Sequence, residues 1–151
     1  MTEIERMADQ LKRAFEGEAW HGPSVQEVLA EVRAEQAAAR PLAHAHSIWE
    51  IVLHLAAWDG LVRRRLEGEQ VDNPDEGDWP LVKDRSEAAW SNTLEWLKNN
   101  HTKLRRTVSW LDDSSLDEPL DGGKSSAYIT IHGSIQHYLY HAGQIALLKK
   151  A

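Results

Sequence analysis

The sequence predicts an all-α protein, and three observations support that fold class. Apolar residues recur at intervals of three and four along most of the 151 residues, whereas the alternating pattern of strands is nearly absent. Four of the apolar stretches follow a capping signal, in which serine, threonine or aspartate precedes glutamate by three positions. A chain of this length can bury about 70% of its unfolded surface in one core, so we expect a single domain over residues 1–151.

The first predicted helix begins at a capping box formed by Thr2 and Glu5, and it ends at Gly17. Ser24 opens a second helical segment in the same way. This segment ends before Pro41, because proline disfavours the helical conformation in the residue that precedes it. We interpret the second segment as one short accessory helix.

The third predicted helix is capped by Ser47 and continues to Gly68. Residues 69–83 contain two prolines and several acids, so we expect a long loop there, held to the body of the protein by Trp79. Asp84 then caps a long helix in which apolar residues at spacings of four and three form a seam as far as residues 112–113.

A polar connection over residues 114–126 leads to the last predicted helix, which covers about residues 130–150. Four substantial helices, two long connections and one accessory helix indicate a four-helix bundle that is not a simple up-down-up-down arrangement. Such bundles place metal sites in their cores.

The composition excludes several classes of protein and site. The chain has no cysteine, which excludes disulfides, thiolate metal ligands and a cysteine nucleophile, and which fits a reducing compartment. A formal net charge of −7 at pH 7 argues against binding to nucleic acid, and the one basic cluster, residues 63–65, points in several directions on a helix. No apolar run is long enough to span a membrane, and residues 1–15 lack the uncharged stretch of a secretory signal. We expect a cytoplasmic protein.

Three histidines predict a metal site. His137 and His141 are four residues apart in the last predicted helix, so both imidazoles lie on one face and can bind a single divalent ion. His54 flanks the apolar face of the third predicted helix and could supply a third ligand. Three histidines leave coordination positions open, which is typical of catalytic sites. Gln144, three residues after His141, either orients a ligand or contacts substrate, or is a helix-surface glutamine.

Other polar residues have ordinary structural interpretations. His101 lies on the seam of the long helix, where we expect a buried histidine or a pocket wall, and His132 projects from the side of the last helix opposite His137. Glu50 could act as a general base, but its part in the helix cap explains it without catalysis. Asp59 could be a buried hydrogen-bonding group. Three more histidines fall in predicted loops, where one of them could line a pocket mouth: His21, His44 and His46.

Two segments resemble the DinB/YfiT superfamily of metal-dependent enzymes. They are SIWEIVLHLAAWDGLVRRRLEG around His54 and IQHYLYHAGQIALLKK around His137 and His141. Weaker agreement in AWHGPSVQEVL and DWPLVKDRSEAAW extends the resemblance over nearly the whole chain. It implies that His54, His137 and His141 bind one nickel or zinc ion, and that the fold is an up-down-down-up bundle which forms a homodimer.

The resemblance also implies a class of reaction. It points to S-transferases that use low-molecular-weight thiols such as bacillithiol, and to related hydrolases or isomerases, so a small thiol and an electrophile are the expected substrates. In such a site the ion lowers the pKa of a water or thiol ligand at its open positions. The sequence offers no convincing general base near the metal. A bundle that binds a metal or small molecule without catalysis therefore remains the alternative.

Overall fold

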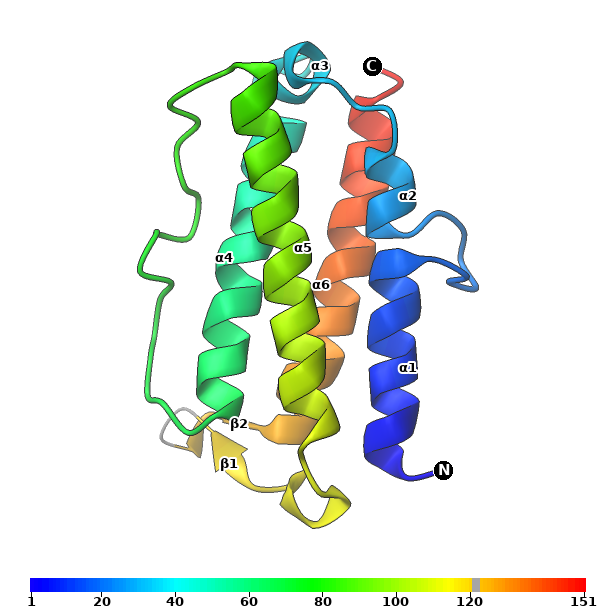
Figure 1. The fold of residues 1–151 in the computed structure, drawn as a ribbon, viewed down its shortest axis with the longest axis vertical. Helices are drawn as coiled ribbons and strands as arrows, with labels where there is room; N and C mark the ends of the chain where they lie inside the picture. Colours follow the sequence, from blue (N-terminus) through cyan, green and yellow to red (C-terminus); the bar gives the residue numbers. More distant parts are fainter. Residues whose placement is uncertain (121–122) are drawn as a thin grey trace.

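The structure, a computed structural model, describes residues 1–120 and 123–151. Its four long helices lie side by side (Figure 1): α1 (Glu3–Glu16), α4 (Ile48–Leu66), α5 (Glu87–Ser109) and α6 (Ala127–Leu148). Helices α1 and α6 run in one direction, and α4 and α5 run in the other. Both α1 and α4 pack against α5 and α6. The prediction of an all-α protein is confirmed.

Side-chain caps explain where the helices begin. Thr2 and Glu5 form the predicted capping box of α1, in which the Thr2 hydroxyl accepts a hydrogen bond from the Glu5 amide at 3.1 Å. The Ser47 hydroxyl caps α4 by accepting from the Glu50 amide at 3.2 Å. Each cap pairs one of the amides that the first turn of a helix leaves without a partner. These two helix starts were predictable from local sequence.

The boundaries of α5 and α6 correct the prediction. The cap of α5 is Ser86 and not Asp84, because the Ser86 hydroxyl accepts from the Ala89 amide while the Asp84 carboxylate accepts from the Ser86 amide. The helix ends at Ser109, three residues earlier than predicted, and Asp112 begins a separate turn of 3-10 helix, η1 (Asp113–Ser115). Helix α6 begins at Ala127 because the Ser126 hydroxyl caps it.

Two further parts of the chain differ from the prediction. The single accessory helix is in fact two short helices, α2 (Val25–Leu29) and α3 (Ala34–Ala38). They are separated at Glu31, whose φ of 66° is incompatible with a continuous helix. The connection before α6, predicted as a plain polar loop, contains the short antiparallel strands β1 (Pro119–Leu120) and β2 (Ser125–Ser126). Residues 121 and 122 of that connection lie outside the described part.

The loop between α4 and α5 runs along the outer side of α4 without regular secondary structure (Figure 1), as predicted from its composition. The core lies between the four long helices, where large side chains such as Trp49, Trp90, Tyr138 and Phe15 are fully buried. Of the helices in the described residues, none combines the length and the apolar character that crossing a membrane requires.

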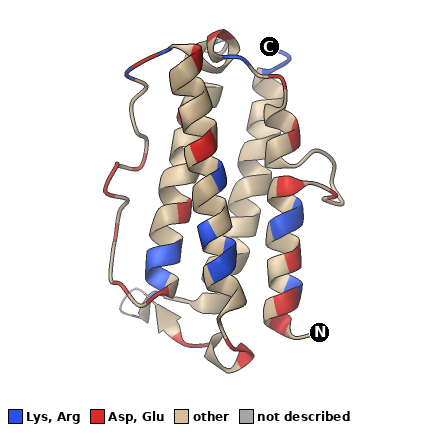
Figure 2. Ribbon diagram, in the orientation of Figure 1, with Lys and Arg blue, Asp and Glu red and all other residues tan. Residues whose placement is uncertain are grey.

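Charged residues of both signs share the outer surface, and they alternate along α1 in the view of Figure 2. The basic cluster at the end of α4 is paired with acids. Arg63 contacts Glu67 at 2.7 Å, and Arg64 contacts Glu69 at 2.7 Å. These pairs neutralise much of the cluster's positive charge locally.

Candidate metal centre

The fold brings the three predicted histidines together. His54 lies on α4, and His137 and His141 lie one turn apart on α6. The Nε2 atom of His137 is 2.9 Å from Nε2 of His54 and 3.0 Å from Nε2 of His141. One nitrogen from each ring lies within 4.8 Å of the other two, an arrangement that could hold a metal ion. Among the described residues, this is the group of three or more histidine and acidic side chains with that geometry.

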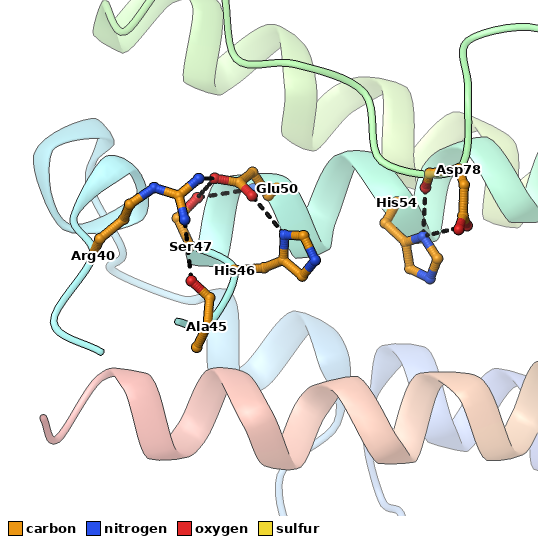
Figure 3. Close-up of polar contacts among 7 residues, drawn as sticks. All are labelled: Arg40, Ala45, His46, Ser47, Glu50, His54 and Asp78. Atoms are coloured by element: carbon orange, nitrogen blue, oxygen red, sulfur yellow. Dashed lines mark hydrogen bonds and ion pairs between the residues drawn. The ribbon is translucent and has the colours of Figure 1, made fainter. Parts of the chain in front are cut away.

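His54 is oriented by the loop between α4 and α5. Its Nδ1–H donates to the backbone carbonyl of Asp78 at 2.6 Å and lies 3.2 Å from the Asp78 carboxylate, as Figure 3 shows. The indole of Trp79 stacks on the imidazole, with ring centroids 3.9 Å apart and planes 7° apart. Because Nδ1 carries the proton, Nε2 presents its lone pair to the other two histidines.

Gln144 orients His141 in the same manner. Its Oε1 atom accepts a hydrogen bond from Nδ1–H of His141 at 2.6 Å. The spacing of three residues places both side chains on the same side of α6, so the contact follows from the helix geometry. His141 therefore also presents the lone pair of Nε2 to the centre of the cluster.

Burial keeps the three imidazoles neutral. It lowers the pKa of His137 to about 3, with a smaller contribution from the neighbouring His141, and it lowers the pKa of His141 to about 4. Burial also lowers the pKa of His54, although its contact with Asp78 acts in the opposite direction. Neutral imidazoles are the form that binds a metal ion, so the site is ready to bind one at pH 7.

The donor set fits a divalent transition-metal ion. Three Nε2 atoms converge, and a proton on His137 can bridge to one neighbour at a time, whereas one cation can accept all three lone pairs. Imidazole nitrogens bound at about 2.0–2.1 Å to one zinc ion lie about 3.3 Å apart in a tetrahedral site. The observed separations of 2.9 and 3.0 Å are close to that value. Histidine nitrogen suits zinc and nickel alike.

Two cavities meet at the histidine cluster. The leucine-lined cavity, of about 450 Å³, is bordered by Leu42, Leu147, Leu148, Trp79, His141 and Gln144. The hydroxyl-lined cavity, of about 410 Å³, is bordered by Ser125, Thr130, Ser134, Arg65, His54 and His137. The cluster is therefore accessible from two sides, one lined by leucines and one that carries three hydroxyl side chains among its apolar lining.

A second layer of contacts supports the wall of the leucine-lined cavity. The ring of His46 stacks on the Trp79 indole, with ring centroids 3.6 Å apart. Nδ1–H of His46 donates to Glu50 at 2.7 Å, and Arg40 also binds the Glu50 carboxylate (Figure 3). The Glu50 amide thus donates to the Ser47 cap of α4, and the Glu50 carboxylate holds His46 and Arg40.

The other predicted residues have separate places. His101 is buried and bonds to the Tyr138 hydroxyl, and Asp59 is buried and bonds to the same group. His132 packs on Tyr128 away from the cluster. Two loop histidines, His44 and His46, border the leucine-lined cavity.

Asp78, whose backbone carbonyl fixes His54, was not predicted from the sequence. The contribution of a backbone carbonyl in an irregular loop leaves no signal in the pattern of side chains. The only related prediction was that the neighbouring Trp79 holds the loop to the body of the protein. The stacking of Trp79 on His54 was likewise not predicted, although its role in holding the loop was.

Comparisons with known proteins identify the family of the chain. A sequence model of the DinB superfamily matches residues 18–145, a range that includes all three histidines. A search of curated proteins finds no match, and a search of solved structures finds none. The family match covers well over half of the chain, and the chain therefore belongs to the DinB superfamily.

Proposed function

We propose that the protein is a metal-dependent enzyme in which His54, His137 and His141 hold one divalent ion, zinc or nickel. The convergence of three Nε2 lone pairs carries this proposal, because two of the rings are fixed in the metal-binding tautomer by hydrogen bonds at Nδ1. A three-histidine site leaves positions open for other ligands, as in catalytic zinc sites. An ion held there supplies a Lewis acid that lowers the pKa of a water or thiol ligand.

The reaction we propose is transfer of a low-molecular-weight thiol, of the bacillithiol type, to an electrophile. The two cavities support a reaction between two substrates, since each reaches the histidine cluster from its own side. The apolar body of an electrophile fits the leucine-lined cavity. A polar thiol fits the hydroxyl-lined cavity, where Ser125, Thr130 and Ser134 offer hydrogen bonds.

In this reaction the thiol gives its proton to water, its sulfur bonds to the electrophilic carbon, and the leaving group departs with the electron pair of the bond that breaks. The protein's own residues position the reactants. Asp78 and Gln144 keep two imidazoles in place, and Trp79 covers His54 and limits the access of water. Hydrolysis or isomerisation at the same centre is the alternative reaction, with water or the substrate's own atoms in place of the thiol.

A conjugation assay tests the reaction. Zinc-loaded protein, chelator-treated protein and the variant His54→Ala are mixed with a small thiol and monochlorobimane, whose thioether product is fluorescent. We expect zinc-loaded protein to accelerate product formation, and the other two samples to lose that acceleration. His21→Ala, which changes an exposed loop histidine, is the matched control and should retain it. Equal rates with and without metal would exclude a metal-dependent thiol transferase.

We also propose that the scaffold is a single up-down-down-up four-helix bundle that forms a homodimer. The directions of the four long helices support the bundle (Figure 1). Exposed tryptophans, Trp20 and Trp110, are consistent with a surface that associates. Sedimentation velocity at micromolar concentration tests the dimer, and a single species of 17.1 kDa would contradict it.

A further inference from the structure

Three buried polar side chains form a hydrogen-bonded row beside the metal centre. The Tyr138 hydroxyl lies 2.6 Å from Oδ2 of Asp59 and 2.9 Å from Nδ1 of His101. Exposure of the three residues is 2% for Asp59, 0% for Tyr138 and 1% for His101. They come from α4, α6 and α5, so the row crosses the interior of the protein.

The two ends of the row face different surroundings. Asp59 borders the hydroxyl-lined cavity, together with His54 and His137. At the other end, Nε2 of His101 is buried, has no hydrogen-bond partner among the described residues, and lies 3.7 Å from the carboxylate of Glu16. The Glu16 side chain is 34% exposed and pairs with Arg105. The row thus connects the cavity at the metal centre with a solvent-accessible carboxylate on α1.

The same atomic positions accommodate two proton arrangements. In the first, Asp59 is ionised, the Tyr138 hydroxyl donates to it, and Nδ1–H of His101 donates to the Tyr138 oxygen. Nε2 of His101 then carries a lone pair toward Glu16. In the second, Asp59 is protonated and donates to the Tyr138 oxygen, the Tyr138 hydroxyl donates to Nδ1 of His101, and Nε2 carries a proton toward Glu16. The second arrangement contains one proton more.

We propose that Asp59, Tyr138 and His101 form a proton relay between the hydroxyl-lined cavity and the surface at Glu16. A proton that binds Nε2 of His101 releases the Nδ1 proton to the Tyr138 oxygen, and the Tyr138 proton moves to Oδ2 of Asp59. One proton enters at Nε2 of His101 and one arrives at Oδ2 of Asp59, while Tyr138 holds one proton before and after the step. Asp59 can then exchange this proton with a substrate or water in the cavity. The relay goes beyond the proposed metal-dependent reaction and does not require it.

The electrostatics favour exchange of a proton without a lasting buried charge. Burial raises the pKa of Asp59 to about 8, against the hydrogen bond from Tyr138, so a cavity-side proton is held and released near neutral pH. Burial lowers the pKa of His101 to about 3, helped by Arg105, so its imidazole remains neutral between transfers. Arg65 and Asp78 are the other charged groups that border the cavity. Glu16 and Arg105 are those at the far end.

The alternative is a static polar cluster that only fixes the packing of the helices. The tautomer of His101 distinguishes the two, because a relay exchanges the protonated ring nitrogen whenever Asp59 gains or loses its proton. A static cluster leaves the ring unchanged. The ¹⁵N chemical shifts of the two ring nitrogens report the tautomer directly, and the ¹³C shift of the Asp59 carboxyl reports its ionisation.

The experiment is an NMR titration of the isotopically labelled full-length protein between pH 6.5 and 9.5, with and without zinc. We expect His101 to change from the Nε2–H to the Nδ1–H tautomer with the same midpoint as the ionisation of Asp59. Asp59→Asn, which cannot ionise, should keep the Nε2–H tautomer throughout. Ser134→Ala, which changes a neighbouring hydroxyl of the same cavity, should switch like the wild type.

Tyr138→Phe removes the central hydroxyl. In this variant the ionisation of Asp59 should no longer change the tautomer of His101. If this variant does not fold, the comparison of Asp59→Asn with wild type still decides the question. The relay is overturned if His101 keeps one tautomer while Asp59 ionises, or if the tautomer changes in Asp59→Asn. Metal binding is measured separately, so failure of the relay leaves the metal site unaffected, and failure of the metal site leaves the relay intact.

Discussion

Each of two imidazoles in the histidine cluster is held by a hydrogen bond at the nitrogen that does not face the centre. Asp78 supplies a backbone carbonyl to His54, and Gln144 supplies a side-chain oxygen to His141. His137, His141 and Gln144 were predictable because spacings of three and four place residues on one face of a helix, and His54 was predicted from its place beside the apolar face of its own helix. Asp78 was not, because its contribution depends on the path of a loop and not on its side chain.

Loss of the Gln144 contact should weaken metal binding without unfolding the protein. In Gln144→Leu, Nδ1–H of His141 loses its acceptor and the ring gains rotational freedom. We expect the affinity for zinc to fall about 10- to 100-fold, the usual effect of removing such a partner. Gln136→Leu, on the exposed face of the same helix, is the matched control and should bind zinc like the wild type. Calorimetric titration of both variants measures the difference, and equal affinities would show that Gln144 has no orienting role.

Asp59 should give the stability of the protein a distinctive dependence on pH. Its folded-state pKa of about 8 lies above its ordinary value, so between about pH 4 and 8 the folded protein keeps a proton that the unfolded chain has lost. The free energy of unfolding therefore falls as pH rises through that window and levels off above it. The wild type should lose on the order of 1–2 kcal/mol more than Asp59→Asn between pH 6.5 and 8.5.

Urea unfolding of both proteins at the two pH values measures this difference. The comparison cancels the other titrating groups, including the cluster histidines, whose lowered pKa values act in the opposite sense below about pH 6.5. Parallel stability curves for the two proteins would show that Asp59 is ionised in the folded state at neutral pH.

The helices and their connections contribute to the site in different ways. Helices α4 and α6 supply the ligands, and their starts are fixed by the serine caps Ser47 and Ser126. The capping signal predicted the first of these. It misplaced the start of α5 and gave no start for α6, because Ser86 and Ser126 cap without a glutamate three residues later and so lack the reciprocal half of the motif. The division of the accessory helix at Glu31 had no local signal at all.

The loop over residues 67–86 should be anchored through Trp79, which stacks between His46 and His54. In Trp79→Ala we expect faster proteolysis of this loop and weaker zinc binding, because the Asp78 carbonyl is no longer held against His54. Leu81→Ala, two residues further on and 79% exposed, is the matched control and should change neither property. Limited proteolysis at a fixed protease ratio compares the variants, and equal cleavage rates would place the anchor elsewhere.

We expect the whole molecule to owe its stability to the core between the long helices and not to an ion. Buried side chains from all four long helices, among them Phe15, Trp49, Trp90 and Tyr138, form a continuous apolar cluster. A chain of 151 residues has enough apolar surface for this, unlike a zinc finger, which is unfolded without its metal. The all-α class was predictable because it follows from periodicity along the entire chain.

Removal of metal should therefore leave the protein helical. An ion that binds the folded state alone adds about 2.7 kcal/mol when free metal is a hundred times its dissociation constant. For a chain of this size, that corresponds to a rise of several degrees in the melting temperature. Circular dichroism of chelator-treated protein at 25 °C should show the full helical signal. A signal that collapses without metal and returns with zinc would make the ion a structural element.

Zinc stoichiometry in equilibrium dialysis tests the central claim, that His54, His137 and His141 form one metal site. Wild-type protein should bind one ion per chain, and binding should persist at pH 6 and decline as the pH falls toward about 4, the pKa of His141, where protons begin to compete for the imidazoles. His137→Ala removes the ring that lies between the other two and should lose the tight site, whereas His132→Ala, on the same helix but outside the cluster, should keep it. Full stoichiometry and wild-type affinity in His137→Ala would contradict the proposed metal centre.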